Sequence, residues 1–246
     1  MFESIISAGN LPVWGAAVAV AVAIVAGHAS GFFAARKIQS RGMDLRQLRR
    51  EALLAILTVG VVGTLLTVFT DRLHEWGLIE FRAGPAAWWV VALEYLLYWF
   101  YFDAFFYWAH RLIHIEPLYT WVHKAHHLST KPNMLTSLSN NPLEPALTGL
   151  GTPLFFMLVT VHEEARLLIL PTALIMGFYV HSGYELMPRW WNRNPVTKWI
   201  VTATFHDQHH RYFTGNYGAY MTIWDRFCGT VRSRYDIDFR SERKSF

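Results

Sequence analysis

The sequence predicts an all-α integral membrane protein with four to five transmembrane helices and a helical cap on the cytosolic side. Composition is the first observation behind this prediction, since 53% of the 246 residues are hydrophobic and 16% are charged. Soluble globular chains carry about 25% charged residues, so this deficit argues against an ordinary cytosolic protein. A series of five apolar stretches is the second observation. The third is the content of 11 tryptophans, a residue that gathers at membrane interfaces.

The apolar stretches cover residues 11–35, 52–70, 86–109, 145–161 and 167–187. A membrane-spanning helix needs about 17–25 apolar residues, which the first three stretches clearly supply. The last two are shorter and follow one another closely, so they form either two spans or a hairpin that does not fully cross. Because the first stretch lacks the basic flank of a cleavable signal peptide, we interpret it as a retained span.

The charges of the loops set the orientation. The loop of residues 36–51 holds six Arg and Lys residues, whereas residues 71–85 carry a slight excess of acidic residues. The positive-inside rule therefore places residues 36–51 in the cytoplasm. Residues 110–144 and the chain from Pro188 onward then lie on the same side and form the cap.

We expect a single domain over residues 1–246, because the cytosolic pieces are short and fold against the helix ends. Residues 1–85 would supply two N-terminal transmembrane helices, and residues 86–246 the catalytic helices and the cap. The host membrane would be the inner membrane in a bacterium or the endoplasmic reticulum in a eukaryote. The net charge of +4 is too small to indicate nucleic-acid binding.

Histidines supply the chemical signal, because nine of the twelve fall on the predicted cytosolic side. They form an HX3H cluster and two HXXHH clusters, with one further histidine between the latter two. Residues three and four apart share a helix face, which lets two imidazoles bind one metal ion. Nine ligands exceed the need of one ion, so the sequence predicts a site for two metal ions. The candidate ligands, which would carry catalysis by holding the metals, are His110, His114, His123, His126, His127, His181, His206, His209 and His210.

Other residue types narrow the kind of metal site. Cys228 is the one cysteine, which excludes a cysteine-based zinc cage and an iron–sulfur cluster of the usual type. Imidazole ligands suit zinc, copper, iron and nickel. The remaining histidines, His28, His74 and His162, fall within the membrane or on its outer side, and we interpret them as non-ligands.

Acidic residues near the clusters are candidates for orienting the ligands or lining a substrate path. Asp103 lies nearly on the helix face of the first cluster but about 10 Å deeper. A carboxylate within a membrane segment is a functional candidate, although a structural hydrogen bond explains Asp103 equally well. Glu185 follows His181 by one turn and Asp207 lies inside the last cluster, so each is expected to accept a ligand's second N–H. Glu94 faces the opposite side of its helix, which favours a structural role.

The order and spacing of the histidine clusters resemble those of the fatty acid hydroxylase / sterol desaturase superfamily. The resemblance covers roughly residues 95–232 and extends beyond the histidines. It includes HSGYE at residues 181–185, NYG at 216–218, WDR at 224–226 and GT at 229–230.

One segment departs from this family pattern. Many relatives carry a histidine immediately before the proline of the segment that reads NNPLE here, where this chain has Asn141. An asparagine can hold a metal-bound water by hydrogen bonding, so Asn141 either tunes one metal or is a bystander. Glu144 in the same segment is a weaker candidate for contact with a ligand.

The resemblance implies two iron ions on the cytosolic side and O2 as a co-substrate. The implied reaction hydroxylates, or desaturates, an unactivated C–H bond of a lipid such as a sterol, a fatty acyl chain or a carotenoid. A separate electron donor of the ferredoxin or cytochrome type, with its reductase, is also implied, because the sequence carries no flavin or nicotinamide fingerprint. The aromatic run at residues 99–108 would wall the lipid's path, although a role in the interfacial belt and core packing is favoured.

Two other classes of protein are compatible with clustered histidines. A zinc-dependent membrane hydrolase would activate water, but it needs about three protein ligands, and the HEXXH pattern is absent from the sequence. A non-enzymatic membrane protein that binds or transports metal would hold its site near the bilayer midplane, whereas these histidines gather at one face. Dependence of product formation on O2, and metal uptake into sealed vesicles, would distinguish these alternatives.

Overall fold

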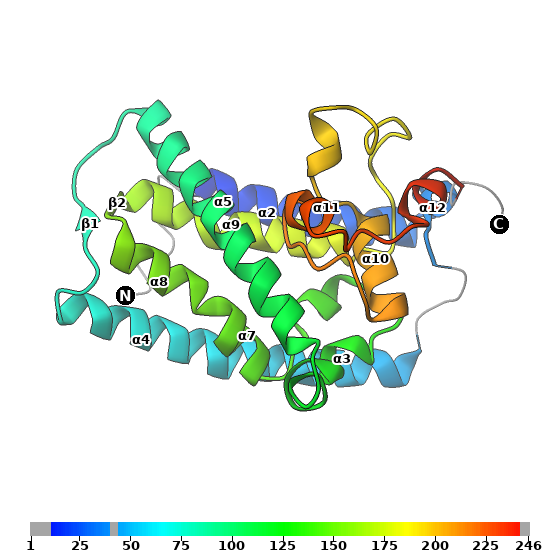
Figure 1. Ribbon diagram of the computed structural model, residues 1–246, viewed down its shortest axis with the longest axis horizontal. Helices are drawn as coiled ribbons and strands as arrows, with labels where there is room; N and C mark the ends of the chain where they lie inside the picture. The colour runs from blue at the N-terminus through cyan, green and yellow to red at the C-terminus, as the bar shows by residue number, and fades with distance from the viewer. Residues whose placement is uncertain (1–10, 40–43, 242–246) are drawn as a thin grey trace.

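The computed structural model describes residues 11–39 and 44–241, and these ranges are mostly helical. Long helices run side by side through one part of the molecule, and shorter helices gather at one end, on the right of Figure 1. The longer elements are α2 (Leu11–Ala29), α3 (Leu45–Leu57), the π-helical turn η2 (Thr58–Gly63), α4 (Thr64–Glu75), α5 (Trp88–Ile113) and α9 (Glu163–Val180). The shorter elements are η1 (Ala34–Arg36), β1 (Phe81–Arg82), η3 (Tyr119–His123), α6 (Lys124–His127), η4 (Met134–Leu138), α7 (Leu143–Gly149), α8 (Gly151–Leu158), β2 (Val161–His162), η5 (Thr197–Trp199), α10 (Ala203–Tyr212), α11 (Ile223–Phe227) and α12 (Tyr235–Ser241).

Two helical segments in the described part of the chain are long and apolar enough to cross a membrane. They are α5 and the continuous segment Leu45–Glu75, in which α3, η2 and α4 follow one another without a break. Large apolar side chains cover their outer surfaces, as at Ile56, which is 70% exposed. Exposed apolar surface of this extent is favourable in lipid and unfavourable in water. The stretches 52–70 and 86–109 thus lie, as predicted, in helices whose length and apolar composition suit a membrane span.

The other predicted stretches form shorter helices than expected. The first ends at Ala29 rather than at residue 35, because the chain turns at Gly31, which has a φ of +72°. The stretch 145–161 is split at Leu150 into α7 and α8, so neither part is long enough to span a bilayer alone. The stretch 167–187 corresponds to α9, which ends at Val180 and packs along α2. A total of four to five spans remains a prediction.

Helix α5 links the apolar part of the bundle to the cap, crossing the molecule diagonally in Figure 1. Aromatic side chains four residues apart line one of its faces, and neighbouring rings contact one another. The ring centroids are 5.5 Å apart for Tyr98 and Phe102, 6.0 Å for Phe102 and Phe106, and 5.1 Å for Phe106 and His110. Because residues four apart share a helix face, this column leads directly to the first histidine cluster.

Helix α8 packs closely against α5 through Gly151. A Cβ atom at this position would lie 2.5 Å from Phe105 Cδ1, so a larger residue would force the helices apart. At the far end of the bundle, β1 pairs in parallel with β2. Glu94 on α5 secures this pairing, since it accepts hydrogen bonds from the His162 backbone and from Arg82. The structural role predicted for Glu94 is thus confirmed.

One buried carboxylate attaches the cap to the bundle, and another holds a loop within the cap. Glu51 on α3 accepts hydrogen bonds from Asn133 and Thr136, at 2.5 and 3.0 Å, and is itself fully buried. Asp225 accepts from the backbone N–H groups of Tyr217 and Gly218 at 2.9 and 2.7 Å. A buried charged acceptor of this kind stabilises the loop that it binds, because removing it would leave buried N–H groups unpaired.

Candidate metal centre

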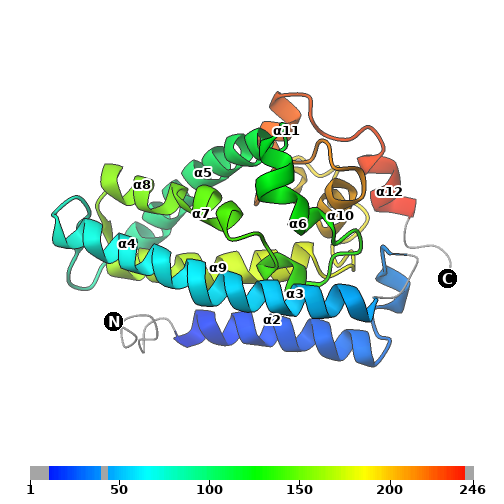
Figure 2. The same ribbon diagram turned by 90° about the horizontal axis from the view of Figure 1, so that it is seen from below.

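All nine histidines predicted as ligands converge in the cap, where α6 and α10 lie near the ends of α5 and α9 (Figure 2). They form two groups, and within each group the potential ligand atoms lie within 4.8 Å of one another. The five-histidine group consists of His110, His114, His123, His127 and His209. The four-histidine group consists of His126, His181, His206 and His210.

Each HXXHH cluster divides its histidines between the two groups. The first and last histidines of a cluster, which are four residues apart, join the same group, and the middle one joins the other. His123 and His127 thus belong to the five-histidine group while His126 belongs to the four-histidine group. The cluster on α10 does the reverse, since His209 joins the five-histidine group. This exchange follows from helix geometry. Viewed along the helix axis, the residue three positions after the first histidine lies on one side of it, and the residue four positions after lies on the other.

The local backbone explains how the remaining histidines reach the centre. His114 and His181 are the residues that follow the last turns of α5 and α9, so both ligands project from helix ends. A π-helical turn, η3, precedes the first HXXHH cluster and ends at His123. Turns of this type are frequent at functional sites.

The distances between ring nitrogens fit shared metal ions. In the five-histidine group, His123 Nε2 lies 3.0 Å from His110 Nε2 and 2.9 Å from His127 Nε2. In the four-histidine group, His206 Nε2 lies 2.9 Å from His181 Nε2 and 3.2 Å from His210 Nε2. Two nitrogens that bind one ion at about 2.1 Å, roughly at a right angle, are about 3.0 Å apart.

Hydrogen bonds to backbone carbonyls fix which ring nitrogen faces the centre. The Nδ1 atoms of His110, His181 and His209 each lie 2.8 Å from a carbonyl oxygen, those of Tyr217, Gly177 and Gly215 respectively. A carbonyl oxygen only accepts, so Nδ1 carries the proton and the Nε2 lone pair points into the group.

Two Nε2 atoms of the five-histidine group lack a hydrogen-bond partner among the described residues. Nε2 of His209 is buried and has no hydrogen-bond partner among the described residues, and the same holds for Nε2 of His114. Buried polar atoms are normally paired, so an unpaired set of imidazole nitrogens calls for a cation. The donor set, consisting of neutral imidazoles without thiolates, suits iron and other first-row transition metals.

Burial keeps the cap histidines neutral. It lowers the pKa of His126 to about 3 and that of His114 to about 2, and it places the pKa values of His206, His209 and His210 well below the ordinary value. The neighbouring imidazoles add to the effect, since each would repel a second positive charge. Neutral imidazole is the form that binds metal, so the site is ready to bind at neutral pH.

Glu144 is the acidic residue that the structure brings to the centre. Its Oε2 lies 2.8 Å from Nδ1 of His123, and both side chains are buried. Burial raises the pKa of Glu144 well above its ordinary value. A carboxylate beside the outer nitrogen of a ligating histidine orients the ring and raises its basicity. The expected contact between Glu144 and a ligand is therefore present.

The hydrogen bonds of Glu185 and Asp207 go to residues other than the histidines, contrary to prediction. Glu185 accepts hydrogen bonds from the Tyr179 hydroxyl and the Thr204 backbone, both at 3.0 Å. It thereby joins α9 to the start of α10, while the outer nitrogen of His181 is taken by a carbonyl group in its own helix. Asp207 accepts from Gln39 and Arg211, each at 3.2 Å. Both carboxylates position helix α10 rather than an imidazole ring.

Asp103 is a structural anchor in this fold, which favours the structural hydrogen bond over a role in lining a substrate path. It is 1% exposed, and its Oδ1 accepts the backbone N–H groups of Tyr220 and Met221, both at 2.9 Å. These bonds attach α5 to the segment that supplies the Tyr217 carbonyl to His110. The effect of Asp103 on the metal centre is therefore indirect.

Asn141 also has structural partners. Its amide nitrogen donates to the Trp121 carbonyl oxygen and its amide oxygen accepts from the Leu143 backbone, both at 3.0 Å. Because both ends of the amide are engaged at the start of α7, the bystander interpretation is favoured over a bond to metal-bound water.

The three histidines predicted to be non-ligands lie outside both groups. His28 contacts the Tyr184 hydroxyl, His74 lies 2.8 Å from the Ile79 carbonyl oxygen, and His162 lies 2.9 Å from Glu94. Each has a structural partner of its own.

Sequence reasoning missed the groups that orient the ligands, because most of them are backbone carbonyls. Gly215 is the clearest case, with a φ of +76° and a position where a Cβ atom would lie 2.6 Å from the Thr230 carbonyl oxygen. The glycine is required for the loop that presents its carbonyl to His209. The signal available in the sequence was the NYG motif that directly follows it.

The arrangement defines a membrane protein with a buried, histidine-rich site suited to two metal ions. Comparison with known families agrees, since the family model for fatty acid hydroxylase matches residues 95–230. The chain therefore belongs to the fatty acid hydroxylase family.

Three relatives illustrate the range of similar proteins. The methylsterol monooxygenase erg25A of Aspergillus fumigatus is 37% identical over 134 residues, which cover 52% of this chain and 43% of the relative. The Delta(7)-sterol 5(6)-desaturase ERG3B of Gibberella zeae is 25% identical over 188 residues, which cover 76% of this chain and 57% of the relative. Human lathosterol oxidase is 28% identical over 180 residues, which cover 73% of this chain and 57% of the relative. The chain thus spans about half the length of the curated relatives that it matches. No solved structure shows significant similarity to it.

Proposed function

We propose that this protein is an O2-dependent lipid oxidase that holds two iron ions and hydroxylates, or desaturates, an unactivated C–H bond. The observation that carries the proposal is the convergence of nine imidazoles, eight of them buried, in two adjacent groups, where Nε2 of His114 and of His209 has no hydrogen-bond partner among the described residues. Membership of the fatty acid hydroxylase family and the names of the relatives support oxidation of a lipid.

The five-histidine and four-histidine groups would each hold one iron. When bound, the irons supply the electrons that reduce O2 and the oxidising power that an unactivated C–H bond requires. The carbonyl groups of Tyr217, Gly177 and Gly215 keep a proton on the outer nitrogen of their histidines and so leave the inner nitrogen free for metal. Burial of the rings excludes water from the centre, which protects a reactive oxidant from side reactions.

The overall reaction sets the partners. Hydroxylation converts C–H to C–OH and consumes one O2, two electrons and two protons, with release of one water. The electrons would come from a separate ferredoxin or cytochrome with its reductase. The cap faces the cytoplasm in the predicted topology, and its arginine-rich surface would attract an acidic carrier. The substrate would be a membrane lipid, with sterols, fatty acyl chains and carotenoids as the candidate classes.

The experiment is lipid mass spectrometry of cells that express the protein with iron and a donor system under ¹⁸O2. Wild-type protein is expected to produce a lipid that carries one ¹⁸O, or a lipid that has lost two hydrogens, and His126→Ala to produce neither. A product that forms equally well without O2 would contradict the proposal and favour a zinc-dependent hydrolase.

A further inference from the structure

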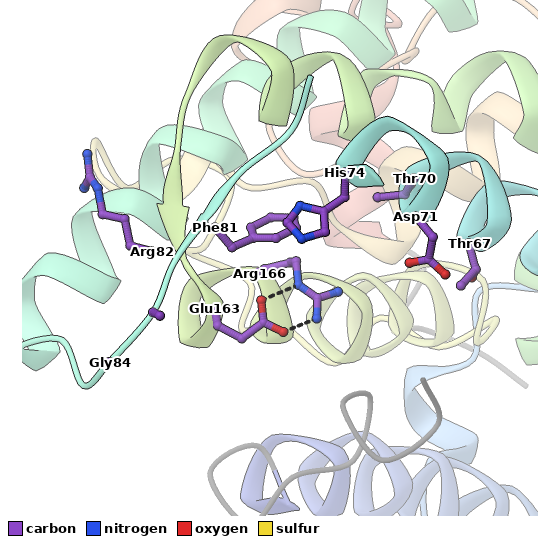
Figure 3. Close-up of a pocket in the computed structure, with 10 residues that line it drawn as sticks. Thr67, Thr70, Asp71, His74, Phe81, Arg82, Gly84, Glu163 and Arg166 are labelled. Atoms are coloured by element: carbon purple, nitrogen blue, oxygen red, sulfur yellow. Dashed lines mark hydrogen bonds and ion pairs between the residues drawn. The ribbon is translucent and has the colours of Figure 1, made fainter. Parts of the chain in front are cut away.

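Two adjoining cavities lie in the bundle, outside the two histidine groups of the cap. The polar chamber, of about 490 Å³, is lined by side chains that include Thr70, Asp71, His74, Arg82 and Arg166 (Figure 3). The apolar chamber, of about 330 Å³, is lined mainly by apolar and aromatic side chains, among them Leu66, Phe102, Phe156, Leu170, Ala173 and Tyr220. Thr67, Thr70, Asp71 and Arg166 line both chambers, so the two adjoin. Together they have the character of a site for a molecule with one polar end.

The charges of the polar chamber leave one group in need of a hydrogen-bond donor. Arg166 is paired with Glu163 across a 2.8 Å hydrogen bond from its Nε, as Figure 3 shows, and Arg82 lies 3.0 Å from Glu94. Asp71 has a buried oxygen, Oδ2, that has no partner among the described residues. A buried carboxylate oxygen without a donor costs free energy, which a ligand that brings a donor would recover.

The neighbouring hydroxyl groups cannot serve as that donor. Thr67 and Thr70 on α4 donate to the carbonyl oxygens of Gly63 and Leu66, both at 2.9 Å, and so present only lone pairs to the chamber. Oδ2 of Asp71 therefore receives no hydrogen bond from these two hydroxyl groups. The hydroxyl group of an alcohol, which brings one donor, complements this arrangement.

The position of the chambers sets the distance to the metal centre. Arg166 lines both chambers and lies 15 residues before His181 in α9 and its last turn, which corresponds to about 22 Å. Phe102, in the wall of the apolar chamber, lies eight residues before His110 on α5, or about 12 Å. The ring of Phe106 bridges that interval, in contact with both Phe102 and His110.

We propose that the two chambers form one binding site for a long-chain lipid alcohol, with its hydroxyl on Asp71 and its apolar body directed along Phe102 and Phe106. The proposal rests on the proposed function, since the histidines would oxidise the end of the lipid that approaches them. The oxidised carbon then lies roughly 20 Å from the hydroxyl. In a sterol this selects the side chain rather than the ring carbons beside the hydroxyl.

Binding measurements test the site without any need for metal or turnover. The probes are a radiolabelled sterol alcohol and its methyl ether, which lacks the hydroxyl proton, bound to the full chain in nanodiscs. Wild-type protein is expected to bind the alcohol at least tenfold more tightly than the ether, because the lost bond is to a charged group. In Asp71→Ala this preference is expected to vanish. In the control Glu75→Ala, one turn further along α4 and paired with Arg72, it is expected to persist.

A second pair of variants tests the apolar chamber. Ala173→Phe fills the chamber and is expected to weaken the binding of alcohol and ether alike by at least tenfold. Val68→Phe, on the exposed side of α4, is expected to leave the binding of both unchanged. Equal binding of alcohol and ether to wild-type protein would overturn the proposal, as would a preference that survives in Asp71→Ala.

Mapping the oxidised carbon completes the test. Fragmentation of the product is expected to place the new oxygen or double bond at the end of the lipid remote from the hydroxyl, and oxidation beside the hydroxyl would overturn the proposal. The two hypotheses fail differently. Binding that follows the prediction without any oxidation supports the lipid site and contradicts the proposed function. Oxidation of a lipid whose binding does not depend on Asp71 supports the proposed function and contradicts the lipid site.

Discussion

Glu144→Ala is the substitution that most sharply tests how the metal centre is organised. Glu144 Oε2 lies 2.8 Å from Nδ1 of His123, and the two residues are 8% and 1% exposed. His123 in turn faces both His110 and His127 through its Nε2. Removing such an outer partner typically costs 10–100-fold in metal affinity, or about 1.4–2.8 kcal/mol. We expect a loss in this range, concentrated in the metal held by the five-histidine group.

The assay is competition between the purified protein and a chelator of known affinity, read as metal bound per chain. Glu144→Gln keeps an acceptor oxygen and is expected to recover part of the affinity. Glu164→Ala, an exposed glutamate on α9, is the matched control and should match wild type. If Glu144→Ala bound both metals as tightly as wild type, the assigned role of Glu144 in orienting His123 would be wrong.

Three further predictions follow from the same geometry. Both His126→Ala and His209→Ala are expected to lose metal and activity while still inserting in the membrane, and full activity of either would remove that residue from the ligand set. Asp103→Ala leaves two backbone N–H groups without their acceptor and should destabilise the protein by about 2–5 kcal/mol. Asp103→Asn keeps an acceptor oxygen and should cost less. Equal thermal stability of wild type and Asp103→Ala would contradict the role of Asp103 as a structural anchor. The pKa of His126 is about 3 in the folded chain and about 6.5 when unfolded, so stability of the metal-free protein is lost as pH falls below 6.5. At pH 5.5 this histidine is expected to lower the free energy of unfolding by roughly 1.4 kcal/mol. An unchanged melting temperature between pH 7.5 and 5.5 would refute this pH dependence.

The membrane helices could be predicted in part because length and apolar content are properties of the sequence itself. Residues 52–70 and 86–109 both lie in helices long enough to span a bilayer. The sequence did not reveal that the first of these extends back to Leu45 without a break, since polar residues there point to the cap rather than ending the helix. Gln47 and Glu51 are examples, because both bond to the segment around residues 131–136.

The ligand set was predictable because metal-binding histidines need fixed side-chain types at fixed spacings. Which histidines from different clusters share a group was not predictable, because it depends on how α6 and α10 pack against one another. The outer partners were predicted least well. Glu185 and Asp207 have the right charge and lie close in sequence to ligands, yet they bond to α10 and its neighbours. Backbone carbonyl groups orient several of the ligands instead. Every residue has such a group, so residue types do not reveal which carbonyls contact a histidine.

The identity and number of bound metals test the central claim most directly. The measurement is elemental analysis of anaerobically purified wild-type protein, with His181→Ala, which lacks one ligand of the four-histidine group, as the comparison. The account predicts two iron ions per chain in wild type and a selective loss of one in His181→Ala. A single zinc ion per chain, or protein without iron that still turns over substrate, would contradict it.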